Sequence, residues 1–311
     1  MAVNMKGKHL LSINDLTKEE IYQVLDTAKS LKIKLYSGEP HKYLEGKSLA
    51  LVFQKPSLRT KVSFDVGMYQ LGGHPVYLGP NEIKIGQREI EEDIIRVLSR
   101  YVDGVMARVF DHKVLVEFAK YSRVPVVNGL SDYEHPCQIL GDLLTIREKK
   151  NRLEGLKVTY IGDSNNVSNS LMFACTKLGM DITISSPKGY EPTKEVLKIA
   201  NENAAYTGAK VRVIRDPKEA AEGADVLYTD VWTSMGEESE REQRRKAFQG
   251  YRIDTELLKV ADEKSIILHC LPAHYDEELE YEAARSVHSV IFDQAENRLH
   301  AQKAILVNLM R

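Results

Sequence analysis

The sequence predicts an α/β protein made of two doubly wound domains, each with a parallel sheet flanked by helices. Short apolar runs alternate with helical patterns along the chain, as expected where each strand returns through a crossover helix. The polar stretch 147–155 interrupts this alternation once. With 311 residues, 43% of them apolar, the chain can bury two cores. We therefore predict one domain over residues 1–148 and a second over residues 149–293.

Short apolar runs between the helical patterns predict the strands. In the first domain these runs are Ser48–Phe53, Pro75–Leu78, Val105–Val109 and Val124–Val127. In the second domain they are Lys157–Ile161, Asp181–Ser185, Val211–Ile214, Val226–Asp230, Ser265–His269 and Val290–Phe292.

Helix starts are marked by capping residues and by proline. Thr17 and Glu20 form a capping box, which predicts a helix that continues to the Ser37-Gly38 break. Pro136 follows His135 where its missing N–H costs nothing, so a helix is expected from there to about Lys149. Further helices are predicted near 58–71, 89–101 and 112–120. The last helix, 294–311, is expected to pack back on the first domain, although its pattern fits either domain.

Composition excludes several classes of partner. The 43 Lys+Arg and 45 Asp+Glu residues are interspersed and leave a net charge of −2, so neither nucleic acid nor an anionic membrane is indicated. The most basic run, 241–246, is flanked by glutamates and is predicted to be the solvated face of a helix. Three scattered cysteines indicate a reducing compartment. No signal-peptide core or membrane span is apparent, and we expect a cytoplasmic protein.

The loop after the first strand has the features of a phosphate cradle. Ser57 is a good N-cap, and a helix N-terminus offers N–H groups and a partial positive charge. The hydroxyls of Ser57 and Thr60 and the guanidinium of Arg59 surround the same point, so an anion with several oxygens is a suitable ligand. The alternative is that Ser57 only caps a surface helix while Arg59 and Lys61 face water.

Two more strand ends in the first domain carry polar groups, and in such sheets ligands bind beyond these ends. Arg108 ends a strand, where a cation is costly without an anionic partner. His135 and Gln138 lie three residues apart on the first turn of a helix, and both can donate to a carbonyl or an amide. The alternatives are a structural ion pair for Arg108 and a helix-capping role for His135.

In the second domain, Gly162 is followed by amide and hydroxyl side chains instead of the G-x-G-x-x-G pattern, so nicotinamide and flavin cofactors are not expected. Asn165 and Asn166 either close a turn or bind a zwitterionic ligand. Asp230 offers a carboxylate to an ammonium group, whereas Trp232 is predicted to pack. A nucleophilic or zinc-binding role for Cys270 is weakly supported, because no second Cys/His cluster completes a zinc site.

Four motifs together resemble the aspartate/ornithine carbamoyltransferase family over essentially the whole chain. They are S-x-R-T at Ser57–Thr60, H-P-x-Q at His135–Gln138, S-M-G at Ser234–Gly236 and H-C-L-P at His269–Pro272. The first two are shared by the family, and the last two resemble its ornithine branch. The resemblance implies transfer of the carbamoyl group of carbamoyl phosphate to the side-chain amine of L-ornithine, giving citrulline and phosphate. It also implies a site in the cleft between the domains, no metal, no organic cofactor, and a homotrimer or a multiple of trimers.

The resemblance assigns the site residues one by one. Those implied for carbamoyl phosphate are Ser57, Leu58 (through its backbone), Arg59, Thr60, Lys84, Arg108, His135, Gln138, Cys270, Leu271 and Arg298. Those implied for ornithine are Asn166, Asp230, Ser234 and Met235. The catalytic set is Arg59, Arg108, His135 and Cys270.

The chain departs from the family pattern at three positions. Leu58 stands where threonine is usual. Lys61 stands where arginine is usual, and the lysine keeps the positive charge but cannot make the bidentate contact of a guanidinium. Lys84 replaces a usual glutamine in loop 80–89, which in the family reaches a neighbouring subunit, and a lysine there resembles the aspartate enzyme. Aspartate or a diamine such as putrescine is therefore the alternative acceptor, although Asp230 disfavours aspartate. A non-catalytic binding protein is a further alternative, but it would be expected to have lost catalytic residues that are all present.

Overall fold

The computed structural model describes residues 3–233 and 238–311. The chain divides into two compact units: unit 1 comprises Met1–Leu144 and Glu296–Arg311, and unit 2 comprises Thr145–Ala295. The division falls inside helix α6 (Pro136–Lys150), which starts at the predicted proline. Among the described residues, no helix combines the length and the apolar character needed to cross a membrane.

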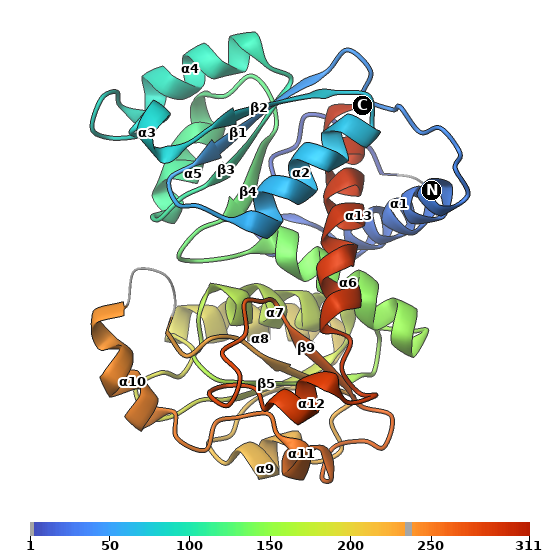
Figure 1. The fold of residues 1–311 in the computed structure, drawn as a ribbon, viewed down its shortest axis with the longest axis vertical. Coiled ribbons are helices and arrows are strands. Elements are labelled where there is room, and N and C mark those ends of the chain that lie inside the picture. The colour runs from blue at the N-terminus through green and yellow to red at the C-terminus, as the bar shows by residue number, and fades with distance from the viewer. Residues whose placement is uncertain (1–2, 234–237) are drawn as a thin grey trace. The chain divides into compact units, whose positions relative to one another are not determined.

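Unit 1 contains a four-stranded parallel sheet with the order β2-β1-β3-β4 (Figure 1). The strands are β1 (Ser48–Phe53), β2 (His74–Leu78), β3 (Gly104–Arg108) and β4 (Val126–Leu130). All four predicted strands are present, and β4 begins two residues later than the predicted Val124.

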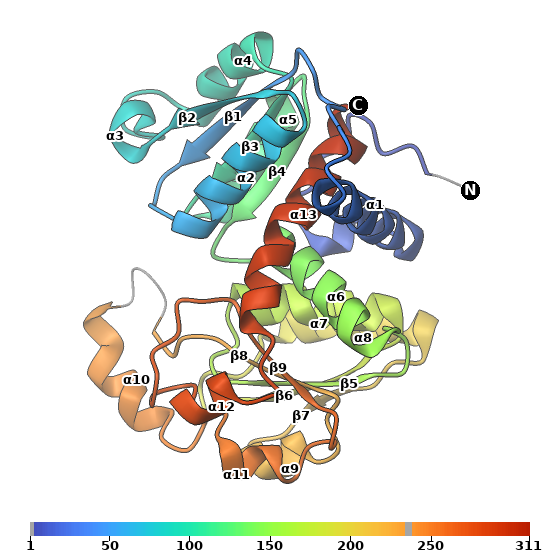
Figure 2. The ribbon, with the colours of Figure 1, turned by 45° about the vertical axis from the view of Figure 1, so that its right-hand side comes forward.

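Helices cover both faces of this sheet. The short elements of unit 1 are η1 (Ile13–Asp15) and α3 (Pro80–Ile83), and its longer helices are α1 (Lys18–Tyr36), α2 (Leu58–Gln70), α4 (Glu91–Tyr101), α5 (His112–Tyr121) and the C-terminal part of α13 (Ile291–Met310). Helices α4 and α5 share a core with β1 and β3 that includes Ile95, Phe118, Ala50 and Val105. Successive strand residues point to opposite faces, and α2 lies on the other face, side by side with α13 (Figures 1 and 2).

Unit 2 contains a five-stranded parallel sheet with the order β7-β6-β5-β8-β9. Its strands are β5 (Lys157–Ile161), β6 (Asp181–Ser185), β7 (Val211–Val213), β8 (Val226–Thr229) and β9 (Ile266–His269). Its helices are α7 (Asn166–Leu178), α8 (Lys194–Thr207), α9 (Pro217–Ala221), η2 (Glu238–Glu240), α10 (Arg241–Ala247), α11 (Thr255–Leu258) and α12 (Tyr281–Arg285). Helices α7 and α8 lie on one face, and α9, α11 and α12 lie on the other (Figure 1).

The prediction of a strand at Val290–Phe292 is wrong. Ser289 makes an isolated bridge to Ile267, and Val290 donates to the Ile267 carbonyl, but α13 begins at Ile291. Val290 and Ile291 are buried whereas Phe292 is 61% exposed. A run of three apolar residues does not distinguish a strand end from the first turn of a helix that buries one side.

Each sheet has one point where the connections leave to opposite faces. In unit 1 this point lies between β1 and β3, because the chain leaves β1 through α2 and leaves β3 through α5. In unit 2 it lies between β5 and β8, which continue into α7 and toward α10. Ligands of doubly wound sheets bind at such switch points. The predicted loops at Ser57 and Arg108, and those at Asn165 and Asp230, follow these strands.

Lys303 of α13 is a fully buried cation in unit 1. Its Nζ donates to Gln70 Oε1 at 2.7 Å and lies 3.2 Å from His41 Nε2. Because His41 Nδ1 lies 2.9 Å from the Glu39 carbonyl, we assign that nitrogen the proton, which leaves Nε2 to accept from Lys303. Burial lowers the pKa of the Lys303 ammonium from 10.5 to about 8.

Replacing Lys303 with methionine should therefore change the pH dependence of stability. Between pH 8 and 10.5 the unfolded chain holds a proton that folded Lys303 has lost, so wild-type stability should rise with pH across this window. Below pH 8 the cost of burying the charged ammonium is fully present, and it lowers the free energy of unfolding by about 3 kcal/mol. Urea denaturation at several pH values should show that the free energy of unfolding of wild type increases relative to that of Lys303→Met from pH 8 upward. A constant difference between the two proteins would contradict the assignment.

Candidate active site

The start of α2 has the geometry of an anion site. Ser57 adopts an extended conformation (φ −161°), and its hydroxyl accepts from the Thr60 N–H at 3.4 Å, which confirms it as the N-cap. Leu58 is 73% exposed, so its side chain faces solvent. The first-turn N–H groups of a helix have no acceptor within the helix and favour an anion.

Two buried guanidinium groups converge on the Thr60 hydroxyl. Arg108 Nη1 lies 3.5 Å and Arg298 Nη2 lies 3.2 Å from Thr60 Oγ1. Arg108 is 6% and Arg298 3% exposed, although they are far apart in the sequence. Arg108 is aligned with Phe53 in the sheet, and the Gln54 N–H binds the Arg108 carbonyl, so β1 and β3 bring the Ser57 loop and this guanidinium together. The acceptor between the two cations is a neutral hydroxyl, which leaves the cluster electropositive.

Gln138 joins this cluster through α6. Its Oε1 accepts from Arg298 Nη1 at 2.6 Å, and its Nε2 donates to Asp142 Oδ1 at 2.8 Å. All three side chains are buried. Asp142 follows Gln138 by four residues and therefore lies on the same helix face. The sequence reading missed Asp142, and the signal that identifies it is this i, i+4 spacing from a predicted site residue.

His135 is buried in a positive environment. Burial, followed by the charges of Arg298, Arg108, Lys55 and Arg59, holds the pKa of this imidazole well below its usual value. His135 is therefore neutral at pH 7 and can donate one N–H without adding charge. Lys55 was not predicted to contribute to the site; its ammonium also lies 4.8 Å from the centre of the Phe110 ring.

Two of the departures from the family pattern are placed by the structure. Lys61 lies on the second turn of α2, with its ammonium 3.7 Å from the centre of the Tyr77 ring. Lys84 is exposed, follows α3 and has a left-handed backbone (φ 40°). Its role in carbamoyl phosphate binding stays a prediction.

In unit 2, Asp230 is the centre of a second polar cluster. The Cys270 thiol donates to Asp230 Oδ1 at 3.0 Å, and Asn165 Nδ2 donates to Asp230 Oδ2 at 2.8 Å. Asn165 Oδ1 also accepts from the Val167 and Ser168 N–H groups, so Asn165 caps α7 and orients Asp230. Asp230 is 6% exposed, and its carboxylate suits an ammonium or amine ligand.

The other predicted residues of unit 2 are only partly placed by the structure. Asn166 is the first residue of α7, and Leu271 follows Cys270 directly. Their contacts with ligands stay predictions. Ser234 and Met235 lie outside the described residues. The sequence predicted that Asn165 either closes a turn or binds a zwitterionic ligand, and its helix-capping position is the signal for its structural role.

His269 supports the Cys270 loop and is not available as a metal ligand. Its Nδ1 accepts from the Leu271 N–H at 2.8 Å, so the proton is on Nε2, which lies 3.0 Å from Glu278 Oε1. Both nitrogens are used. The His269, Cys270 and Asp230 ligand atoms lie within 4.8 Å of one another. A metal there would have to break one of the two imidazole hydrogen bonds, so the hydrogen bonding favours a structural role.

The prediction that the basic run 241–246 is a solvated helix face is wrong for Arg244. This residue is 6% exposed; its Nη1 donates to Asp163 Oδ2 at 2.7 Å and to the Trp232 carbonyl at 3.1 Å. Arg244 thus joins α10 to the loop after β5 and to the segment after β8, both of which carry predicted ornithine ligands. Trp232 is 7% exposed and its ring stacks 5.9 Å from that of Phe248, which confirms the prediction that it packs.

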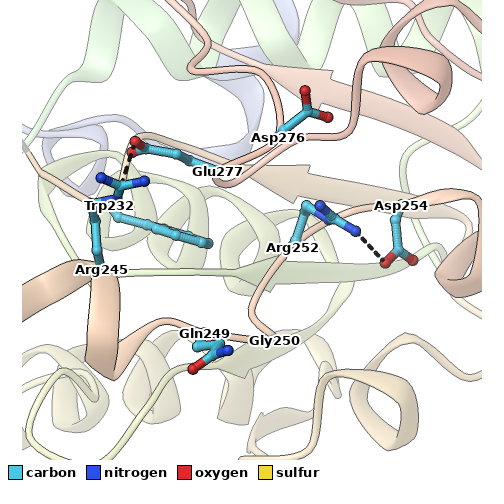
Figure 3. Close-up of a pocket in the computed structure, with 8 residues that line it drawn as sticks. All are labelled: Trp232, Arg245, Gln249, Gly250, Arg252, Asp254, Asp276 and Glu277. Atoms are coloured by element: carbon cyan, nitrogen blue, oxygen red, sulfur yellow. Dashed lines mark ion pairs between the residues drawn. The ribbon is translucent and has the colours of Figure 1, made fainter.

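A cavity of about 390 Å³ lies elsewhere in unit 2. Figure 3 shows its lining: Trp232, Arg245, Gln249, Gly250, Arg252, Asp254, Asp276 and Glu277. Arg245 lies 3.4 Å from Glu277, and Arg252 lies 3.5 Å from Asp254, so most of the charged side chains of the lining are paired with each other. None of the predicted ligand residues in the described part of the chain lines it.

Comparison with known proteins agrees with this organisation. Residues 8–148 match the family domain described as "Aspartate/ornithine carbamoyltransferase, carbamoyl-P binding domain", and residues 154–309 match "Aspartate/ornithine carbamoyltransferase, Asp/Orn binding domain". The chain belongs to the aspartate/ornithine carbamoyltransferase family.

Individual relatives match over the full length of the chain. A curated protein of Thermococcus kodakarensis named "Ornithine carbamoyltransferase" is 52% identical over 310 residues, which cover 100% of this chain and 98% of that protein. One of Pyrococcus furiosus, named "Ornithine carbamoyltransferase, anabolic", has the same identity and coverage. The solved structure of the ornithine carbamoyltransferase from Pyrococcus furiosus superimposes with a TM-score of 0.97, covering 99% of each chain.

Proposed function

We propose that this protein is an enzyme that transfers the carbamoyl group of carbamoyl phosphate to the side-chain amine of L-ornithine, giving L-citrulline and phosphate. The observation that carries this proposal is the buried cluster of Arg108, Arg298 and Thr60 at the N-terminus of α2. Such a cluster suits a dianion with a carbonyl group. The full-length relatives named for ornithine support the choice of acceptor.

In this proposal unit 1 binds carbamoyl phosphate. The phosphate lies at the start of α2, held by Ser57, Arg59, Thr60 and the Leu58 backbone. Arg108, neutral His135 and Thr60 polarise the carbonyl oxygen, and Gln138 accepts from the carbamoyl amine. Arg298 orients the Gln138 carboxamide, because it donates to Gln138 Oε1. These donors are buried and already in place, so they stabilise the oxyanion of the transition state with little reorganisation.

Unit 2 binds ornithine in this proposal, through Asn166, Asp230, Ser234 and Met235. The attacking amine must first lose a proton, because an alkylammonium is not a nucleophile. Asp230, which already accepts from Cys270, and the departing phosphate are candidate acceptors for that proton. Carbamoyl transfer requires the two ligands to meet. No metal or organic cofactor is required.

The predicted product is tested by mixing the purified protein with carbamoyl phosphate and ornithine, aspartate or putrescine in parallel. We expect citrulline to form at least about 10²-fold faster than either other product, because an acceptor that leaves buried polar groups unpaired is strongly disfavoured. Chromatography with mass detection measures all three products. Faster formation of carbamoylaspartate or carbamoylputrescine would overturn the choice of ornithine.

We also propose a homotrimer, or a multiple of trimers, located in the cytoplasm. Leu58, Val62 and Tyr69 are 73%, 49% and 78% exposed and recur along one side of α2, which supports a subunit contact there. Cys137, Cys175 and Cys270 form no disulfide, which supports a reducing compartment. The relative named as anabolic supports the direction of citrulline synthesis for arginine.

A further inference from the structure

Glu134 is a buried carboxylate next to His135 that no part of the proposed reaction uses. It is 0% exposed. Its Oε2 accepts from the Ile13 N–H at 2.9 Å, and its Oε1 accepts from the Ser12 hydroxyl. A buried carboxylate is costly unless such donors surround it. Two of its donors come from a segment more than a hundred residues earlier in the chain.

That segment, Leu10–Asp15, is fixed along the edge of unit 1. Leu10 bridges to Val127 of β4, and the Asn128 N–H donates to the Leu10 carbonyl at 2.8 Å. Asn128 Nδ2 also donates to the Leu11 carbonyl at 2.8 Å. We call residues Leu10–Asp15 the N-terminal brace. It is held at one end by β4 and at the other by Glu134.

The turn that precedes His135 is closed by the same residues. The Ser131 N–H donates to the Glu134 carbonyl at 3.0 Å, and Asn128 Nδ2 lies 3.3 Å from that carbonyl. The backbone of Glu134 is therefore tied to the end of β4, and its side chain is tied to the brace. The next residue along the chain is His135, whose carbonyl accepts from the Gln138 N–H in the first turn of α6.

From these contacts we infer that Glu134 is a positioning residue for His135, which acts by fixing the His135 turn to the N-terminal brace. This inference rests on the proposed function, since it assigns His135 to the polarisation of the carbamoyl carbonyl. A donor contributes fully only when it is aimed at the developing charge before reaction, and a small displacement is expensive. The brace supplies two fixed donors for the carboxylate, so the position of His135 depends on both.

The test compares Glu134→Ala with Glu134→Gln in the full-length enzyme. Glu134→Ala removes both acceptors and should lower kcat by about 30-fold, as expected for a misplaced donor, with the ornithine KM changed by less than about threefold. Glu134→Gln keeps one oxygen acceptor and should lower kcat by about three- to tenfold. The acid limb of the kcat profile should also move to higher pH. Burial, followed by the charges of Arg298, Arg108, Lys55 and Arg59, lowers the pKa of His135, and a loosened turn would let water reach the imidazole and raise that pKa.

Glu20→Ala is the matched control. Glu20 is also a buried glutamate near the N-terminus, but its carboxylate accepts from Lys8 Nζ and from the Thr17 N–H, outside the His135 turn. We expect Glu20→Ala to lower the melting temperature while keeping kcat within about twofold of wild type, since the loss is a helix cap. If kcat falls in the same proportion to the melting temperature in Glu134→Ala and in Glu20→Ala, the inference is overturned.

Two further outcomes separate the inference from the proposed function. Suppose that wild type makes citrulline and that Glu134→Ala has the same kcat and the same acid limb of the kcat profile as wild type. The inference about Glu134 then fails, while the proposed function stands. If wild type makes no citrulline, the proposed function fails first. Should Glu134→Ala not fold, Glu134→Gln decides: a several-fold lower kcat with a shifted acid limb supports the inference, and unchanged values overturn it.

Discussion

Replacing Arg108 with methionine should lower kcat/KM for carbamoyl phosphate by about 10²- to 10³-fold, the effect of removing one preorganised donor from a developing oxyanion. Arg108 is buried at the end of β3 and donates to the Thr60 hydroxyl beside Arg298. Methionine has a similar length, so the substitution removes the charge and the donors with little change in volume. Steady-state citrulline formation at varied carbamoyl phosphate measures the effect.

Arg100→Met provides the matched control for this substitution. Arg100 is exposed in the last turn of α4 in the same unit, so its loss should change kcat/KM by less than about twofold, as for most surface substitutions. Circular dichroism of both variants checks that unit 1 is folded. A folded Arg108→Met protein that retains more than about a tenth of wild-type kcat/KM would contradict the role assigned to this guanidinium.

The second large effect is expected from Arg244→Met. Breaking a buried ion pair leaves Asp163 without its charged partner, which should destabilise the protein by about 3–5 kcal/mol. The loop after β5 and the segment after β8 would lose their common anchor, so the ornithine KM should rise by about tenfold or more, while the carbamoyl phosphate KM changes little. Urea denaturation and steady-state kinetics measure the two effects.

Arg245→Met is the control, because the adjacent residues differ mainly in burial. The Arg245 side chain is 51% exposed, and its Nε lies 3.4 Å from Glu277 Oε1. Solvent screens the exposed guanidinium, so this pair contributes about 1 kcal/mol or less, and Arg245→Met should keep both stability and ornithine KM near wild type. Equal losses in the two variants would show that helix α10, and not the Arg244 anchor, is responsible.

Local patterns made the start of α2 predictable. Ser57 caps the helix because Pro56 prevents regular structure before it and because a hydroxyl at this position can reach the N–H of the third residue. The same reasoning predicted the capping box at Thr17 and the start of α6 at Pro136. These features depend on residues within one helical turn, so the sequence contains the whole interaction.

Contacts between distant segments were not predictable in this way. Arg244 and Arg245 are adjacent and identical in type, and the partners that bury Arg244 lie outside their helix. The partners of Arg244 are Asp163 and the Trp232 carbonyl, which fold against it from other strand ends. Likewise, the sequence left Asn165 as either a turn residue or a ligand of a zwitterion, and it did not indicate that the Asn165 amide donates to Asp230.

The sequence by itself determined the two α/β domains and nearly all of their strands, and its motifs predict an anion site after β1 and an amine site after β8. Hydrophobic periodicity, helix caps and short motifs depend on residues that are close together in the sequence, so the sequence alone is enough to recognise them. Only the tertiary structure decided that Arg298 meets Arg108 at Thr60, that Arg244 is buried, and that the brace reaches Glu134. These contacts depend on which strands become neighbours, and that order results from packing the whole sheet.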